Sequence, residues 1–187
     1  MLINPTVAAP AAWVLRFLPL LPAGLVLDLA CGSGRHTRCL LERGHAVLAL
    51  DRDVAVLSAL QLAGARTMQH DLEAGGLDWP FAAKQFAAIV VSNYLHRPLF
   101  PLLLDSLQEG GVLIYQTFAI GNAAFGKPSN PDFLLHQGEL LAHLAADSSM
   151  QVIAYEHGYV STPKPAVVQR ICARKGGDGA RPSALCS

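Results

Sequence analysis

The residues best suited to chemistry in this chain lie between Asp28 and Asp51. The run Val26-Leu27-Asp28-Leu29-Ala30-Cys31-Gly32-Ser33-Gly34 has the pattern of a buried strand that ends in a glycine turn. Glycine at 32 and 34 allows positive φ angles and a close approach of a ligand to the backbone. Amide groups at the start of the following helix face that ligand, and Asp51 ends the next strand-like segment. The pattern predicts a nucleoside held across the carboxyl ends of two parallel strands.

Spacing within this turn favours one cofactor over another. A dinucleotide fingerprint requires a third glycine, which allows close packing of the helix on the strand, and that position is Thr37 here. An acidic residue, Asp28, stands four positions before Gly32. A carboxylate there would repel a pyrophosphate, but it suits the ammonium and sulfonium groups of S-adenosylmethionine, which carries no phosphate. The sequence therefore favours S-adenosylmethionine.

These motifs resemble those of a known family. Residues 28–34 are similar to the first motif of the class I S-adenosylmethionine-dependent methyltransferases, and Leu48-Ala49-Leu50-Asp51 is similar to the second. Residues 93–100 and 128–135 resemble a bacterial branch close to the tellurite-resistance-type methyltransferases. The resemblance, over residues 10–174, implies methyl transfer to a small-molecule acceptor by in-line displacement. It also implies an α/β, Rossmann-like, doubly wound sheet of seven strands, in the order 3-2-1-4-5-7-6, with the last strand antiparallel and helices on both faces.

Two other functions stay open on the sequence alone. An NAD(P)-dependent oxidoreductase uses a related fold, although the missing third glycine argues against it. A non-catalytic cofactor-binding module is the second, because a fold does not determine a function.

Roles in cofactor binding follow from position. Asp51 would accept hydrogen bonds from both ribose hydroxyls, and a helix N-cap is its alternative role. Asp71 and Leu72 would flank the adenine, with a solvated turn as the alternative. The residues predicted to bind the cofactor are Asp28, Ala30, Gly32, Gly34, Arg35, Asp51, Arg52, Asp71, Leu72 and Asn93.

The predicted catalytic residues are Tyr94, His96 and Arg97, which follow the most apolar segment. Tyr94 would line the methyl end of the cofactor, His96 could take a proton near neutral pH, and Arg97 could hold an oxyanion. A helix-capping histidine and a solvated arginine are the alternatives. The resemblance includes an acidic residue at position 116, where this chain has Gln116. That departure leaves the acceptor chemistry open.

A long loop, residues 119–136, follows the fifth predicted strand. Loops of this length in compact domains often bind ligands. Asn122 and Lys127 could meet a polar acceptor and Phe133 could form an apolar wall, with a plain structured loop as the alternative.

The remaining chain alternates strand-like and helix-like segments, which predicts one domain over residues 1–175. A helix over about 11–18 would pack on the sheet or cap the cofactor pocket, and residues 176–187 would form a disordered tail. A helix is expected over 98–107, with Gly110-Gly111 turning the chain into a strand over 112–118. Another strand is expected near 151–156.

Composition limits the partners. Fourteen basic and fourteen acidic side chains give a net charge of zero, which disfavours nucleic acid as a partner. The four cysteines are far apart and contain no Cys-x-x-Cys pair, so we expect a reducing, cytoplasmic location. Prolines 10, 19 and 22 interrupt the apolar N-terminal stretch, and we predict no signal peptide and no membrane anchor. A monomer or weak homodimer is expected.

No metal site is predicted. His136 and His143 flank Glu139, but a solvated helix surface explains this spacing better than a ligand set does.

Overall fold

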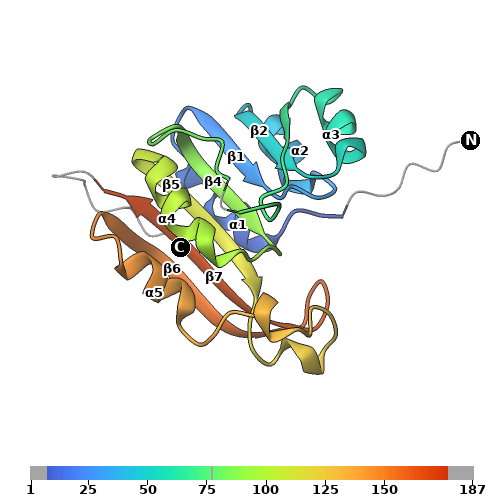
Figure 1. The fold of residues 1–187 in the computed structure, drawn as a ribbon, viewed down its shortest axis with the longest axis vertical. Coiled ribbons are helices and arrows are strands. Elements are labelled where there is room, and N and C mark those ends of the chain that lie inside the picture. Colours follow the sequence, from blue (N-terminus) through green and yellow to red (C-terminus); the bar gives the residue numbers. More distant parts are fainter. Residues whose placement is uncertain (1–7, 77, 177–187) are drawn as a thin grey trace, which may run out of the picture.

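A seven-stranded mixed sheet forms the centre of the computed structural model, which describes residues 8–76 and 78–176 (Figure 1). Its strand order is β3-β2-β1-β4-β5-β7-β6. Strands β1 to β5 pair in parallel, and β7 is antiparallel to both β5 and β6. This confirms the predicted order and the antiparallel last strand. The bounds are β1 Leu25–Leu29, β2 Ala46–Asp51, β3 Arg66–Gln69, β4 Phe86–Ser92, β5 Leu107–Phe118, β6 Met150–Val160 and β7 Ala166–Lys175.

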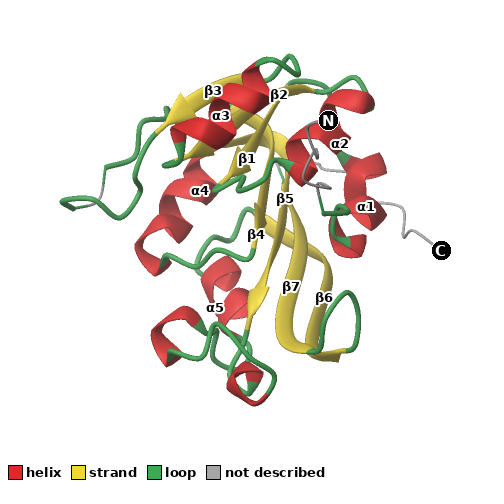
Figure 2. Ribbon diagram, turned by 90° about the vertical axis from the view of Figure 1, so that its right-hand side faces the viewer, coloured by secondary structure: helices red, strands yellow, loops and turns green. Residues whose placement is uncertain are grey.

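Helices cover both faces of this sheet. Figure 2 shows α1 and α2 on one side and α4 and α5 on the other. The bounds are α1 Ala12–Phe17, α2 Arg35–Glu42, α3 Val54–Gln61, α4 Phe100–Ser106 and α5 Glu139–Ala145. Short 3₁₀ helices occupy Leu18–Leu20, Arg97–Leu99, Asn122–Ala124 and Pro131–Phe133.

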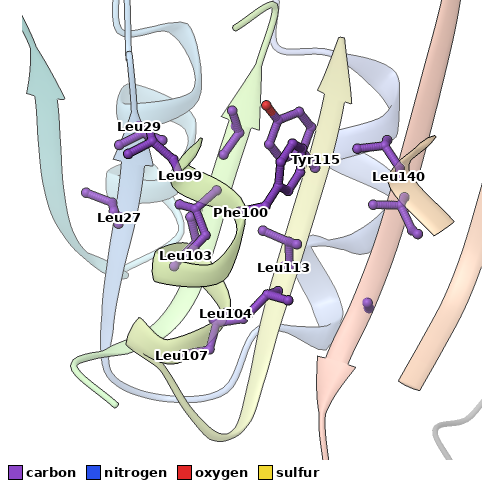
Figure 3. Close-up of a cluster of buried hydrophobic side chains, with 14 of the residues drawn as sticks. Leu27, Leu29, Leu99, Phe100, Leu103, Leu104, Leu107, Leu113, Tyr115 and Leu140 are labelled. Atoms are coloured by element: carbon purple, nitrogen blue, oxygen red, sulfur yellow. The ribbon is translucent and has the colours of Figure 1, made fainter. Parts of the chain in front are cut away.

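The larger core lies between the sheet and α4 and α5. Side chains alternate across a strand, so Leu27 and Leu29 face this side while Val26 and Asp28 face the other. Figure 3 shows residues of α4 packed over the strands, and Phe100 stacks on Tyr115 with ring centroids 5.2 Å apart. Six of the seven β4 residues are buried, as expected for a central strand covered on both sides.

The opposite core is closed by α1, α2 and α3. Trp13 and Phe17 of α1 pack with residues of β5, and the Trp13 indole donates to the Ile171 carbonyl at 3.3 Å. The Ala11 amide donates to His36 Nε2 at 3.1 Å. Burial lowers the pKa of His36 to about 4, which keeps the ring neutral and able to accept this bond. Helix α1 therefore packs on the sheet, and its role as a cap of the cofactor pocket stays a prediction.

Three predicted boundaries were wrong. Strand β5 begins at Leu107 rather than 112, because Phe86 pairs with Leu107 and Ala88 with Val112, which makes residues 108–111 a bulge instead of a turn. Helix α4 accordingly ends at Ser106. Strand β6 extends to Val160 because it pairs with β7 along its whole length. Within the predicted tail, the Gly176 amide donates to the Ser149 carbonyl, and residues 177–187 lie outside the described residues.

Candidate active site

The turn between β1 and α2 has an unusual backbone. Ala30, Gly32 and Gly34 have φ angles of 51°, 52° and 74°. A Cβ on Gly34 would lie 2.2 Å from Leu60 of α3, so this position needs glycine for packing as well as for conformation. A Cβ on Gly32 would meet nothing within 4 Å. Open space over the Gly32 backbone is what a ligand that lies on the turn requires.

Asp51 ties this turn to the end of β2. Its Oδ2 accepts a hydrogen bond from the Gly32 amide at 2.8 Å, and its Oδ1 accepts one from the Asp53 amide at 3.0 Å. The N-cap of α3 is Asp53, which accepts from the Ala55 amide at 2.9 Å, so the alternative capping role of Asp51 was wrong. Each oxygen of a carboxylate has two acceptor sites. Asp51 therefore keeps acceptor capacity beside Gly32.

Asp28 lies beneath the turn rather than in open solvent, with 1% of its surface exposed. Thr37 Oγ1 donates to its Oδ2 at 2.5 Å, while Oδ1 is buried without a partner among the described residues. Burial raises the pKa of Asp28 to about 7, against the lowering effect of its bonds with Thr37. The threonine that replaces the third glycine of a dinucleotide fingerprint thus has a specific role, because it satisfies one oxygen of this carboxylate. A buried, half-satisfied carboxylate fits a cationic ligand placed nearby.

Side chains of α2, β4 and β5 meet next to the turn. Arg35 Nη2 and Gln116 Nε2 both donate to Ser92 Oγ at 3.1 Å. The following residue, Asn93, has a φ of 59° and donates its amide to the Gln116 carbonyl at 3.0 Å. Asparagine tolerates this left-handed conformation better than most residues do. Gln116 thus positions the end of β4, a role that the sequence did not suggest.

A cavity of about 230 Å³ opens beside Asn93. Its walls come from the ends of β4 and β5, from the segment after β3 and from the loop after β5. Burial first, and then the nearby carboxylates of Glu73 and Asp71, raise the pKa of the Tyr94 phenol far above its usual value, so Tyr94 is neutral at neutral pH. The lining residues are Glu73, Asn93, Tyr94, Leu95, Thr117, Phe118, Pro128 and Phe133.

Sequence reasoning missed Glu73 in this lining. The signal was its place two residues after Asp71, where the third parallel strand reaches the same sheet edge as the other motifs. The Glu73 amide donates to Asp71 Oδ1 at 3.0 Å, which shapes the turn that carries both acids.

Arg97 is held by protein groups outside the cavity lining. Its guanidinium donates to both carboxylate oxygens of Glu139, at 2.6 and 3.1 Å. It also donates to the carbonyls of Asp132 and Leu134, at 2.6 and 2.9 Å. The structure gives Arg97 a role as an anchor of the long loop and of α5, whereas its contact with an acceptor oxyanion stays a prediction.

Asn122 also organises the loop. It is 2% exposed, its Nδ2 donates to the Pro128 carbonyl at 3.0 Å, and its Oδ1 accepts from the Val167 amide at 3.1 Å. These bonds commit the amide to the backbone, so the predicted contact of Asn122 with an acceptor does not fit the structure. Of the three predicted loop residues, only Phe133 lines the cavity, while Lys127 is exposed outside its lining.

The remaining residues predicted for the site lie around the Gly32 turn and the cavity. Arg52 and Asp71 are exposed at the ends of β2 and β3, and Leu72 is buried in the larger core. His96 precedes the 3₁₀ helix at Arg97–Leu99 and is half-buried. Their roles with cofactor and acceptor stay predictions.

Comparisons with known proteins agree with this geometry. Residues 26–110 match the family model described as a methyltransferase domain. The chain is 33% identical over 179 residues to a trans-aconitate 2-methyltransferase of Rhizobium meliloti (strain 1021), which covers 89% of this chain. These matches support the class I S-adenosylmethionine-dependent methyltransferase family that the sequence motifs predict. The chain spans 63% of the length of that relative.

Solved structures share the fold. The structure of TehB from Haemophilus influenzae superposes with a TM-score of 0.69 at 17% identity, covering 87% of this chain and 61% of that one. A SAM-dependent methyltransferase from Methanosarcina mazei gives a TM-score of 0.68 at 14% identity, covering 90% of this chain and 99% of that one. The predicted fold is confirmed, the predicted family is supported, and nothing in these comparisons supports the oxidoreductase alternative.

The described ranges contain neither a membrane-spanning helix nor a cluster of metal ligands. Among residues 8–76 and 78–176, no helix has the length and apolar character needed to cross a membrane. In the same part of the chain, no three His, Cys, Asp or Glu side chains gather as a metal site would require. His143 instead stacks on Phe100, with ring centroids 3.8 Å apart, and lies 3.4 Å from Glu139.

Proposed function

We propose that this chain transfers a methyl group from S-adenosylmethionine to a small-molecule acceptor held in the cavity beside Asn93 and Tyr94. The observation that carries the proposal is that the Gly32 turn and the cavity lie at the same edge of the sheet. The Gly32 turn and Asp51 follow β1 and β2, and the cavity lies at the ends of β4 and β5. All four strands are parallel, so a donor on the turn and an acceptor in the cavity would meet at one edge.

The residues around the cofactor position supply binding and charge. Asp51 would accept from the ribose hydroxyls with the acceptor sites that its backbone bonds leave free. Asp28 would compensate the positive charge of the ligand through the turn, since its Oδ1 has no partner among the described residues. When bound, S-adenosylmethionine supplies an electrophilic methyl group on a sulfonium centre.

The cavity residues supply alignment and exclusion of water. Leu95, Phe118 and Phe133 give the cavity apolar walls, which keep water from the reacting groups. Holding the two reactants in line removes much of the entropic barrier to a displacement at carbon. Catalysis by positioning is what this chain's residues are suited to perform, and His96 remains the proposed proton acceptor when the nucleophile arrives protonated.

The partner and the location follow from the same observations. The name of the Rhizobium meliloti relative makes trans-aconitate the first acceptor to assay. Balanced charge supports a small molecule rather than a nucleic acid as partner. Cys31 and Cys39 are buried thiols, which supports a cytoplasmic protein, and we expect a monomer or weak homodimer.

Thermal denaturation with two ligands tests the proposal. S-adenosylhomocysteine at 100 times its Kd stabilises a single site by about 2.7 kcal/mol, which raises the Tm of a chain this size by about 5–11 °C. NADH is expected to leave the Tm unchanged. A shift with NADH and none with S-adenosylhomocysteine would overturn the proposal.

Variants separate the role of Asp51 in cofactor binding from the role of His96 in catalysis. Asp51→Ala and the milder Asp51→Asn are expected to remove the S-adenosylhomocysteine shift, whereas the exposed control Asp105→Asn retains it. His96→Ala is expected to keep the shift and to lower turnover. Equal loss of the shift in His96→Ala and Asp51→Asn would contradict this division.

A further inference from the structure

The charge of the cavity lining is distinctive. Glu73 is a carboxylate, its charge helps to raise the pKa of the nearby Tyr94 phenol, and the other lining residues carry no charge. The cavity is therefore acidic at one point and otherwise neutral or apolar. Such a lining favours an acceptor that carries no negative charge.

No lysine or arginine is among the residues that line the cavity. The Arg97 guanidinium bonds to Glu139 and to two loop carbonyls, and Arg35 donates to Ser92. Lys127 is exposed outside the lining. Arg52 is exposed at the end of β2 and acts on Tyr94 only through space. An anionic acceptor in this cavity would face Glu73 with no lining cation to pair with.

We infer that the acceptor is an uncharged aromatic or heteroaromatic amine that donates an N–H to the Glu73 carboxylate. This inference rests on the proposed methyl transfer and names the class of acceptor for it. Leu95, Phe118, Pro128 and Phe133 provide apolar surfaces for a flat ring, and Asn93 is a further polar residue of the lining.

Charge flow during the reaction favours nitrogen over the other nucleophiles. The nitrogen lone pair forms the new N–C bond while the C–S bond breaks and its electron pair goes to sulfur. Positive charge thus moves from sulfur to nitrogen, and the excess proton on nitrogen passes to Glu73 and then to water. A carboxylate in the cavity lining stabilises the charge that develops on nitrogen, whereas it opposes a thiolate or an oxyanion that must approach as an anion.

Binding to the protein saturated with S-adenosylhomocysteine tests this class directly. Aniline, thiophenol and benzoate present the same ring with an amine, a thiolate and a carboxylate at pH 8, and trans-aconitate adds a polycarboxylate. Calorimetry and ligand-observed NMR measure their affinities. Aniline is expected to bind more tightly than the three anions, and failure of aniline to bind, or tighter binding of any of the anions, would overturn the inference.

Charge variants of Glu73 sharpen the test. Glu73→Gln keeps the shape and is expected to weaken aniline binding by about tenfold, the value of one charged hydrogen bond. Glu73→Lys is expected to reverse the preference towards benzoate. The exposed helix residue Glu42 supplies the matched control, and Glu42→Gln should leave both affinities unchanged. Equal aniline affinity in Glu73→Gln and Glu42→Gln would contradict a role for Glu73.

The two proposals fail in different ways. If S-adenosylhomocysteine does not bind, the proposed function fails. If it binds and the chain methylates trans-aconitate in preference to aniline, methyl transfer stands and the amine acceptor is wrong. Mass spectrometry of the methylated products distinguishes these results.

Discussion

Replacement of Asp28 by asparagine separates the charge of this buried group from its shape. Asparagine can still accept the Thr37 hydrogen bond through its side-chain oxygen. In the cofactor-free protein, burial raises the pKa of Asp28 from 3.8 to about 7. The folded carboxyl therefore binds a proton more tightly than the unfolded one, so its contribution to stability is complete below pH 3.8 and is lost as the pH rises through 7.

The magnitude follows from the size of this shift. At pH 8 the ionised, buried Asp28 lowers the free energy of unfolding by about 4 kcal/mol. Asp28→Asn removes that cost, but it leaves a buried amide NH₂ group without a hydrogen-bond partner. The unpaired group lowers the free energy of unfolding by about 1–3 kcal/mol. We expect the Tm of the variant, relative to the parent, to rise by a few degrees as the pH increases from 5 to 8.

Cofactor affinity should show the opposite dependence on this carboxylate. The ammonium group of S-adenosylhomocysteine favours the ionised form, and the ionised fraction of a group with a pKa of about 7 rises about tenfold between pH 6 and pH 8. Calorimetric affinity of the parent is expected to increase by about tenfold over that range, with proton release at pH 7, and to be flat in Asp28→Asn. Affinity that is independent of pH in the parent, or an equal slope in the variant, would refute the charge compensation.

Two further predictions concern stability. Arg97→Met is expected to lower the free energy of unfolding by about 2–4 kcal/mol, because Glu139 and two backbone carbonyls lose their bonds to the guanidinium. The control Lys84→Met breaks an exposed ion pair with Glu109 and is expected to cost at most about 1 kcal/mol. Urea unfolding compares the two variants, and equal losses would show that Arg97 does not anchor the loop. Ala30→Gly is expected to raise stability by about 0.5–1 kcal/mol, since the φ of 51° strains an L-residue more than the added freedom of glycine costs, and a lower Tm in a melting experiment would contradict strain at this turn.

Much of the fold was predictable because its signals are local. Strands β2 and β4 coincide with apolar runs that polar or turn residues interrupt on both sides, so the local sequence is enough to locate them. The length of β6 was not predictable, because its pairing with β7 determines how far it extends. Likewise, the Gly110-Gly111 pair has the composition of a turn, yet pairing with β4 holds it in a bulge.

The two halves of the site differ in how far sequence could predict them. Asp51 and Gly32 are 19 residues apart, and parallel pairing of consecutive strands brings them within 2.8 Å, so their meeting follows from the motif. Arg97 bonds to the Asp132 carbonyl 35 residues away, and Asn122 accepts from the Val167 amide 45 residues away, so these roles depend on a loop course that no local pattern determines. From the sequence, a polar residue such as Asn122 suggests ligand contact. In the structure its side chain is hydrogen-bonded to backbone groups instead.

The anchoring of the long loop makes it a separable part of the molecule. Arg97 and Asn122 fasten it at its ends to the 3₁₀ helix before α4 and to β7, and none of their bonds reaches the Gly32 turn. The residues between those two anchors, Phe125 among them, can be exchanged, or the segment shortened or lengthened, while the cofactor half keeps its geometry. Grafting a different loop between the two anchors is thus a route to enzymes with new acceptors on an unchanged methyl donor platform.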